Sequence, residues 1–142
     1  MKTIQEIQSE FISAFTEIRD PLLQYEFLLQ IGSQMAPYPE ECRDEQHLIF
    51  GCQSKVWIVC EREDDRIRIF MDSEALIIKG IIAVAVEMFQ GQSACDIAHA
   101  EVTYISQTDL KNQISVDRFR GVHSVIQAIQ NFAASENILE PW

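Results

Sequence analysis

The stretch VWIVCEREDDRIRIFM, residues 56–71, decides the fold. Two runs rich in β-branched and aromatic residues, 56–60 and 67–71, lie on either side of the polar turn 63–65. This pattern predicts two strands joined as an antiparallel hairpin. A shorter run of the same kind, residues 48–50, predicts a third strand that precedes the hairpin.

Helical spacing of apolar residues precedes these strands. Thr3 and Glu6 form a capping box, which predicts a helix over residues 4–18. Asp20, followed by a proline, is a second helix start, and the apolar face that follows ends near Gly32. Two helices should therefore lead into the sheet.

Two more helices are expected after the hairpin. Ser73 is placed to cap a helix that begins at Glu74, runs through an almost wholly apolar stretch and ends at Gly91. A last amphipathic helix should begin near Ser115 or Asp117. The order of elements predicts an α+β fold, with helices on one face of a small three-stranded antiparallel sheet.

Composition limits the classes of protein that fit this chain. Its 142 residues, 47% of them hydrophobic, predict one domain over residues 1–142. A formal charge of -11 and the lack of a Lys or Arg cluster argue against nucleic-acid binding. The longest apolar run, residues 75–86, contains Lys79 and is too short to cross a bilayer. With no signal peptide pattern, we expect a cytoplasmic protein without membrane association.

The four cysteines are expected to be thiols, because structural disulfides are rare in the cytoplasm. Cys60 alternates with apolar residues on a predicted strand, which is typical of a small buried side chain. Cys42 lies among acidic residues that would oppose thiolate formation, and Cys95 lies in a short helical segment. None of these three has the surroundings of a nucleophile.

Cys52 differs from the other cysteines. Gly51 precedes it, polar Gln53 and Ser54 follow it, and the segment joins two predicted strands at a turn. Lys55 is close enough in sequence to favour the thiolate. From these residues alone, a reactive and an inert Cys52 are equally consistent with the pattern.

A metal site is the main alternative that the residues leave open. Cys95 and His99 have the i, i+4 spacing that puts two ligands on one helical face, and His47 precedes Cys52 by five positions. No C-x-x-C pair accompanies them, so we expect no bound metal. Hydrolase triads and phosphate-binding glycine loops have no matching spacing either.

Three blocks of sequence carry a resemblance to a known family. Residues 51–58, GCQSKVWI, closely resemble the G-C-Q-S-x-V-W-[IL] signature of SufE-type sulfur acceptors. Residues 72–83 resemble the family's D-S-[DE]-A-x-I-x-K-G-[IL]-I-A block, and residues 117–121 resemble its [ST]-x-x-R-x-x-G element, with Arg118 on the arginine. The blocks follow the family's order and together span most of the chain.

This resemblance implies a fold shared with cluster scaffolds of the IscU kind and a role for Cys52 as the sulfur-carrying residue. The chain would take a persulfide sulfur from a cysteine desulfurase similar to SufS, stimulate its turnover, and relay the sulfur to a scaffold similar to SufB. It would be a sulfur-transfer partner rather than a stand-alone enzyme, as a monomer or homodimer. It would need no cofactor of its own, since pyridoxal phosphate belongs to the desulfurase.

The resemblance also implies roles for residues near Cys52. Gly51, Gln53, Ser54 and Lys55 would shape its loop, and Arg118 would hold that loop or face the desulfurase. Two other interpretations stay open: a metal-binding or cluster-scaffold protein on the same fold, and an activator that stimulates a desulfurase by docking alone.

Overall fold

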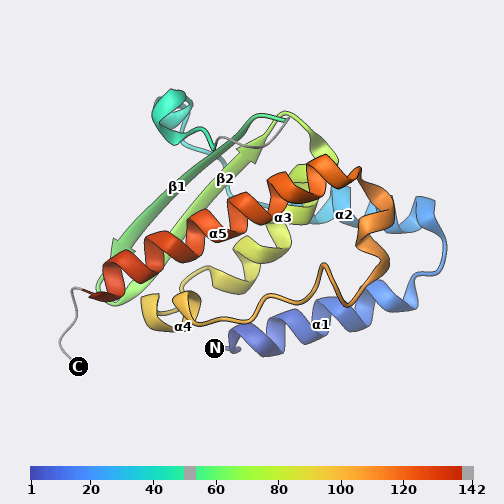
Figure 1. Cartoon of the computed structure of the whole chain (residues 1–142), viewed down its shortest axis with the longest axis horizontal. Coiled ribbons are helices and arrows are strands. Elements are labelled where there is room, and N and C mark those ends of the chain that lie inside the picture. The colour runs from blue at the N-terminus through green and yellow to red at the C-terminus, as the bar shows by residue number, and fades with distance from the viewer. Residues whose placement is uncertain (50–53, 139–142) are drawn as a thin grey trace.

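The computed structural model describes residues 1–49 and 54–138 and has an α+β architecture (Figure 1). Three short 3-10 segments lie in the connections between the longer elements. In chain order the elements are α1 (Ile4–Glu17), α2 (Pro21–Ser33), η1 (Glu40–Cys42), η2 (Glu45–His47), β1 (Val56–Glu63), β2 (Arg66–Ser73), α3 (Leu76–Phe89), α4 (Ala94–Ala98), η3 (Asp109–Gln113) and α5 (Val116–Ile138).

The predicted hairpin is confirmed. β1 and β2 pair antiparallel from Val56 opposite Ser73 to Glu63 opposite Arg66. The turn between them contains Asp64 with a φ of 58°, a left-handed conformation that Asp tolerates better than most residues.

The predicted third strand is wrong within the described residues, where the sheet has two strands. Leu48 forms an isolated bridge to Trp57, and Phe50, the last residue of the predicted strand, lies outside the described residues. The bridge reflects the β preference of this run, but η2 ends at His47 and leaves no room for a longer strand before Leu48.

Both predicted helix starts before the sheet are confirmed. The Thr3 side chain accepts a hydrogen bond from the Glu6 main-chain nitrogen, and the Glu6 carboxylate accepts one from the Thr3 nitrogen. Asp20 accepts from the first-turn nitrogens of α2, with Pro21 at the first position. These caps satisfy donors that the helix itself cannot pair.

The start of α3 differs from the prediction. Ser73 still belongs to β2, so the helix begins at Leu76 rather than at Glu74. The Ser73 hydroxyl does accept a hydrogen bond from the main-chain nitrogen of Ala75, at 3.2 Å. The serine therefore ends the strand and orients the entry into the helix.

Helix α3 runs through the core, as its apolar sequence predicts. Ile78, Ile81 and Ile82 are fully buried. The helix crosses α2 so closely that a Cβ added at Gly80 would overlap the main-chain carbonyl of Leu28. Position 80 therefore requires glycine for packing rather than for an unusual backbone angle.

The two faces of the hairpin are covered differently. The side chains of Val56, Ile58 and Ile69 join the main core with the helices, which confirms that the helices pack on one face. The other face carries Trp57 and Val59, which pack with residues 38–48, called here the cover segment. No helix in the described part of the chain has the length and hydropathy needed to span a membrane.

Candidate functional site

Three of the predicted site residues, Gly51, Cys52 and Gln53, lie outside the described residues. The chain is described on both sides of them. On one side, the Ile49 nitrogen donates a hydrogen bond of 2.9 Å to the Val56 carbonyl. On the other side, Ser54 is half-buried and Lys55 is exposed.

Ser73 fixes the chain where it leaves this segment. Its hydroxyl donates a hydrogen bond of 2.8 Å to the Lys55 carbonyl, which also accepts one of 3.4 Å from the Glu74 nitrogen. Ser73 is only 5% exposed, so water competes little for these bonds. The end of β2 thus holds the first residue before β1 in place.

Asp72 collects three donors at the same end of the sheet. Its carboxylate contacts Arg43 at 2.8 Å and Lys79 at 3.1 Å, and it accepts from the Ser73 nitrogen at 2.9 Å. Partial burial alone would raise the pKa of Asp72, but hydrogen bonds from Lys79 and Arg43 outweigh it and lower the pKa. The carboxylate is therefore an anion that joins β2, the first turn of α3 and the cover segment.

Arg43 ties the cover segment to the sheet. Its guanidinium carbon lies 5.3 Å from the ring centroid of Tyr38 and 4.9 Å from that of Trp57. It also makes two hydrogen bonds to Glu40, at 2.9 and 3.1 Å. Hydrogen bonds to Glu40 and then Asp72 raise the pKa of Arg43, so it is always charged.

The three described cysteines are free thiols, as predicted. Burial raises the pKa of Cys60 to about 12. Burial and then the carboxylates of Glu41, Asp44 and Glu61 raise the pKa of Cys42. Both thiols therefore favour the protonated form, which is the poor nucleophile, and at Cys42 two of the acidic neighbours named from the sequence, Glu41 and Asp44, add to the effect of burial.

Arg118 lies in the first turn of α5, and its main-chain nitrogen bonds the Ser115 hydroxyl at 3.3 Å. Within the described residues its guanidinium forms no ion pair, either with Glu74 or with Asp117. The half-buried side chain thus keeps its donors available.

The course of α5 puts Arg118 at the same end of the sheet as Lys55. Near the C-terminal end of the helix, Glu136 contacts Arg62 at the far end of β1, and the helix runs back along the hairpin (Figure 1). Arg118 lies about 27 Å along the helix from Glu136, whereas Val56 lies about 20 Å along the strand from Arg62. The first turn of α5 and the start of β1 therefore both lie at the end of the hairpin away from the Arg62–Glu136 contact.

Known proteins resemble this chain both in sequence and in fold. The family model for SufE, described as an Fe-S metabolism associated domain, matches residues 9–133. The chain belongs to the SufE family. A structure described as the solution structure of a hypothetical protein from Thermus thermophilus is similar, with a TM-score of 0.76 and 16% identity over 91% of this chain and 94% of that chain. At that identity the likeness concerns the fold alone.

SufE membership places the chain in iron–sulfur metabolism. The contacts at this end of the sheet also involve residues for which the sequence alone predicts no role at the site. Asp72 and Lys79 lie in the 72–83 block without an assigned function, and Ser73 is predicted only as a helix cap. Arg43 belongs to none of the three blocks. Arg43 is the one basic residue within the acidic stretch 40–45, and this isolated positive charge is the sequence feature that could have identified it.

The described residues of this SufE chain give little support to the alternative of a metal-binding protein. Cys95 and His99 do lie together, with the sulfur 3.7 Å from Nδ1, and His47 pairs with Asp44 at 2.7 Å. Over residues 1–49 and 54–138, no three potential ligands converge.

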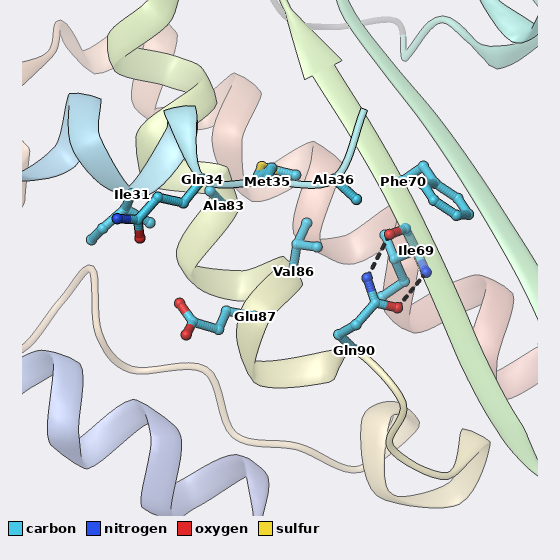
Figure 2. A pocket seen from close by; sticks show the side chains of 10 residues that line it. All are labelled: Ile31, Gln34, Met35, Ala36, Ile69, Phe70, Ala83, Val86, Glu87 and Gln90. Atoms are coloured by element: carbon cyan, nitrogen blue, oxygen red, sulfur yellow. Dashed lines mark hydrogen bonds between the residues drawn. The ribbon is translucent and has the colours of Figure 1, made fainter. Parts of the chain in front are cut away.

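A pocket of about 270 Å³ lies between the end of α2, β2 and α3 (Figure 2). Its walls are mainly apolar, from Ile31, Met35 and Val86, with the carboxylate of Glu87 at the edge. No cysteine or basic side chain lines it, so it offers no group for sulfur chemistry.

Proposed function

We propose that this chain accepts sulfur onto Cys52 from the persulfide of a pyridoxal-phosphate cysteine desulfurase and relays it to an iron–sulfur scaffold. The match to the SufE family over residues 9–133 carries this proposal, because Cys52 stands in the family's most specific motif. The sulfur is cargo, and the pyridoxal phosphate belongs to the desulfurase.

The state of the other cysteines supports the choice of Cys52. A sulfur acceptor must attack as a thiolate, and burial opposes ionisation of Cys42 and Cys60. Cys95 is half-buried on the short helix α4, within contact of His99. Cys42 and Cys60 are therefore unfavourable acceptors, and the resemblance of residues 51–58 to the family's motif assigns the role to Cys52.

The transfer is a thiol–disulfide type exchange. The Cys52 thiolate attacks the outer sulfur of the donor persulfide, a new S–S bond forms at Cys52, and the donor S–S bond breaks. The desulfurase cysteine leaves as a thiolate, so no oxidant or reductant is consumed. Charge near the attacking sulfur matters, and Lys55 and Arg118 are cations at this end of the sheet.

The described residues on both sides of the Cys52 motif are anchored to the sheet, which supports a role for this end of the sheet in docking a partner. Ser73 and Glu74 hold Lys55 from one side, and Ile49 pairs with Val56 on the other.

The direct test is mass spectrometry after incubation with a desulfurase and cysteine. Sulfur acceptance should add about 32 Da, one sulfur atom, and peptide mapping should place it on Cys52. The Cys52→Ser variant should gain no mass, whereas Cys42→Ser, Cys60→Ser and Cys95→Ser should all still gain it. An added mass on any of those three cysteines would show that the site is misassigned.

The same variants separate the alternatives. If Cys52→Ser still stimulates desulfurase turnover fully, the chain acts by docking alone. Metal analysis of protein purified without chelators addresses the scaffold alternative, since a stoichiometric metal lost in Cys52→Ser would point to Cys52 as a ligand.

A further inference from the structure

The exposed apolar side chains of this chain are gathered near the starts of three helices. Apart from Met1, the large apolar side chains that are well exposed within the described residues are Leu22, Leu23 and Tyr25 in α2, Leu76 in α3 and Val116 in α5. Single exposed apolar residues are common on any protein. Their concentration in one region indicates a surface that another molecule covers.

The apolar side chains of α2 form a stripe that leads to α3. Successive residues of a helix are about 100° apart, so Leu22, Tyr25 and Leu29 share one side of α2. Leu23 points to a different side, about 100° away from Leu22. Leu29 and Leu76 line a shallow hollow of about 490 Å³ between α2 and the start of α3. The stripe therefore continues across this hollow to Leu76.

Hydrogen bonds join the start of α2 to the segment before α5. The side-chain amide of Gln113 donates to the Pro21 carbonyl at 3.0 Å and to the Gln24 side-chain oxygen at 3.2 Å. Helix α3 contacts both α2 and α5, and the three helices begin towards the end of the molecule away from the C-terminus (Figure 1). We call the exposed side chains at these starts the helix-start surface, which consists of Leu22, Tyr25, Leu29, Leu76 and Val116.

The basic residues without a partner border this surface. The chain has eleven Lys and Arg residues, and six of them form an ion pair or a side-chain hydrogen bond. Over residues 1–49 and 54–138, the five that form neither are Arg19, Lys55, Lys111, Arg118 and Arg120. Their donors are free to bind the groups of a partner.

Each unpaired cation lies close to one part of the helix-start surface. Arg118 and Arg120 follow Val116 in the first turns of α5. Arg19 and Lys111 line a shallow hollow at the end of α1, on the side where α2 begins.

The fifth cation connects the surface to the end of the sheet. The carbonyl of Lys55 accepts a hydrogen bond from the Glu74 nitrogen, two positions before Leu76. The helix-start surface is therefore continuous with the described residues that flank the Cys52 motif.

The balance of charge at this end differs from that of the remaining chain. The five cations are accompanied by six carboxylates, which are Glu17, Asp20, Glu26, Glu74, Asp109 and Asp117. The remaining chain has six basic and sixteen acidic residues. An acidic protein surface therefore meets less repulsion at this end than elsewhere. An apolar centre with arginines around it and little net charge is the composition of a protein–protein interface.

We propose that the helix-start surface docks the cysteine desulfurase, through an apolar patch of that enzyme bordered by carboxylates. This rests on the proposed function, because sulfur exchange requires the desulfurase to contact the end of the sheet where the Cys52 motif lies. A standard interface covers about 800 Å² on each partner, which is roughly 30 Å across, so one partner can cover Leu22 and Lys55 together.

The test measures desulfurase turnover against the concentration of this chain. Leu22→Gln should raise the concentration that gives half-maximal stimulation about fivefold and leave the turnover at saturation unchanged, because Leu22 contributes to docking alone. Leu23→Gln is the matched control. It makes the same change in the next leucine, which is 53% exposed against 64% for Leu22, and should behave like the wild type.

A second pair of variants tests the charges. Lys111→Glu should raise the half-saturating concentration about threefold, whereas Arg68→Glu, near the hairpin turn, should not change it. Melting temperatures of all four variants show whether each one is folded under the conditions of the assay.

Failure of this proposal and failure of the proposed function give different results. If the wild type gains no sulfur on Cys52, the proposed function is wrong, and calorimetric titration of the desulfurase with Cys52→Ser, with and without Leu22→Gln, still tests the surface. If sulfur does reach Cys52 but Leu22→Gln has the half-saturating concentration of the wild type, or Leu23→Gln shares its defect, the docking proposal is overturned.

Other occupants of the surface would also be recognised. Self-association in sedimentation velocity that Leu22→Gln removes, with unchanged desulfurase binding, would assign the surface to a second copy and overturn the proposal. Binding to phosphatidylglycerol vesicles that depends on Leu22 in the same way would overturn it in favour of a lipid surface.

Discussion

Replacing Ser73 by alanine should lower the free energy of unfolding by about 2 kcal/mol. The hydroxyl donates to the Lys55 carbonyl at 2.8 Å and accepts from the Ala75 nitrogen at 3.2 Å, in a residue that is 5% exposed. Each such bond contributes about 1 kcal/mol net. In the variant, the Lys55 carbonyl still accepts the longer hydrogen bond from the Glu74 nitrogen, so it loses only one of its two bonds. The Ala75 nitrogen loses the Ser73 hydroxyl as its acceptor. For a chain of this length, the melting temperature should fall by roughly 6 °C.

Urea unfolding measures this loss, and sulfur acceptance by the same variant measures its effect on the site. Because Ser73 holds the residue that follows the Cys52 segment, acceptance should slow even at temperatures where the variant is fully folded. Ser33→Ala is the matched control: it also removes one serine hydroxyl bond, to the Gln30 carbonyl, but on an exposed surface. It should lose less than about 0.5 kcal/mol. Equal losses in both variants would refute the reasoning that burial makes the Ser73 bonds strong.

The remaining predictions concern helix packing, an ion pair, a buried thiol and a cation at the site. Gly80→Ala should lower the free energy of unfolding by about 3 kcal/mol in urea, because its Cβ would overlap the Leu28 carbonyl and push two helices apart. Asp72 has a lowered pKa, so its stabilising effect over Asp72→Asn should be complete at pH 7 and disappear in melts as the pH falls below 3.8. Burial raises the pKa of Cys60 to about 12, so alkylation at pH 8 should be slow in the native protein and fast in urea; equal rates would show an accessible thiol. Arg118→Ala should leave the melting temperature nearly unchanged and lower desulfurase activation, with partial recovery in Arg118→Lys, whereas a normal activation curve would remove this residue from the site.

Local sequence signals predicted the elements that depend on local chemistry. The capping box at Thr3, the Asp20 cap and the hairpin turn each bring their own hydrogen-bonding partners within a few residues, so they form as the pattern indicates. The run 48–50 shows the limit of such signals. A strand exists only if a neighbour pairs along its length, and among the described residues this run pairs with β1 only through an isolated bridge at Leu48.

The residues of the candidate site could be predicted from the sequence only where one continuous motif contains them. Cys52 and its neighbours could be named from residues 51–58, but the hydrogen bonds that hold Lys55 come from Ser73, eighteen positions later. Likewise, the pairing of Arg43 with Asp72 joins residues that no local pattern connects. Such contacts follow from the register of the hairpin and the path of the cover segment, which only the tertiary structure determines.

Because Arg43 stacks on Trp57, the fluorescence of this tryptophan can report on the position of the cover segment. The indole lies five positions after Cys52, packs under the cover segment and is 8% exposed. The chain has two tryptophans, and Trp142, the other one, is its last residue, so in a Trp142→Phe variant the emission spectrum comes from Trp57 alone. A red shift on mixing with a desulfurase would then record water reaching the indole, and an unchanged spectrum would show that the cover segment stays on the sheet.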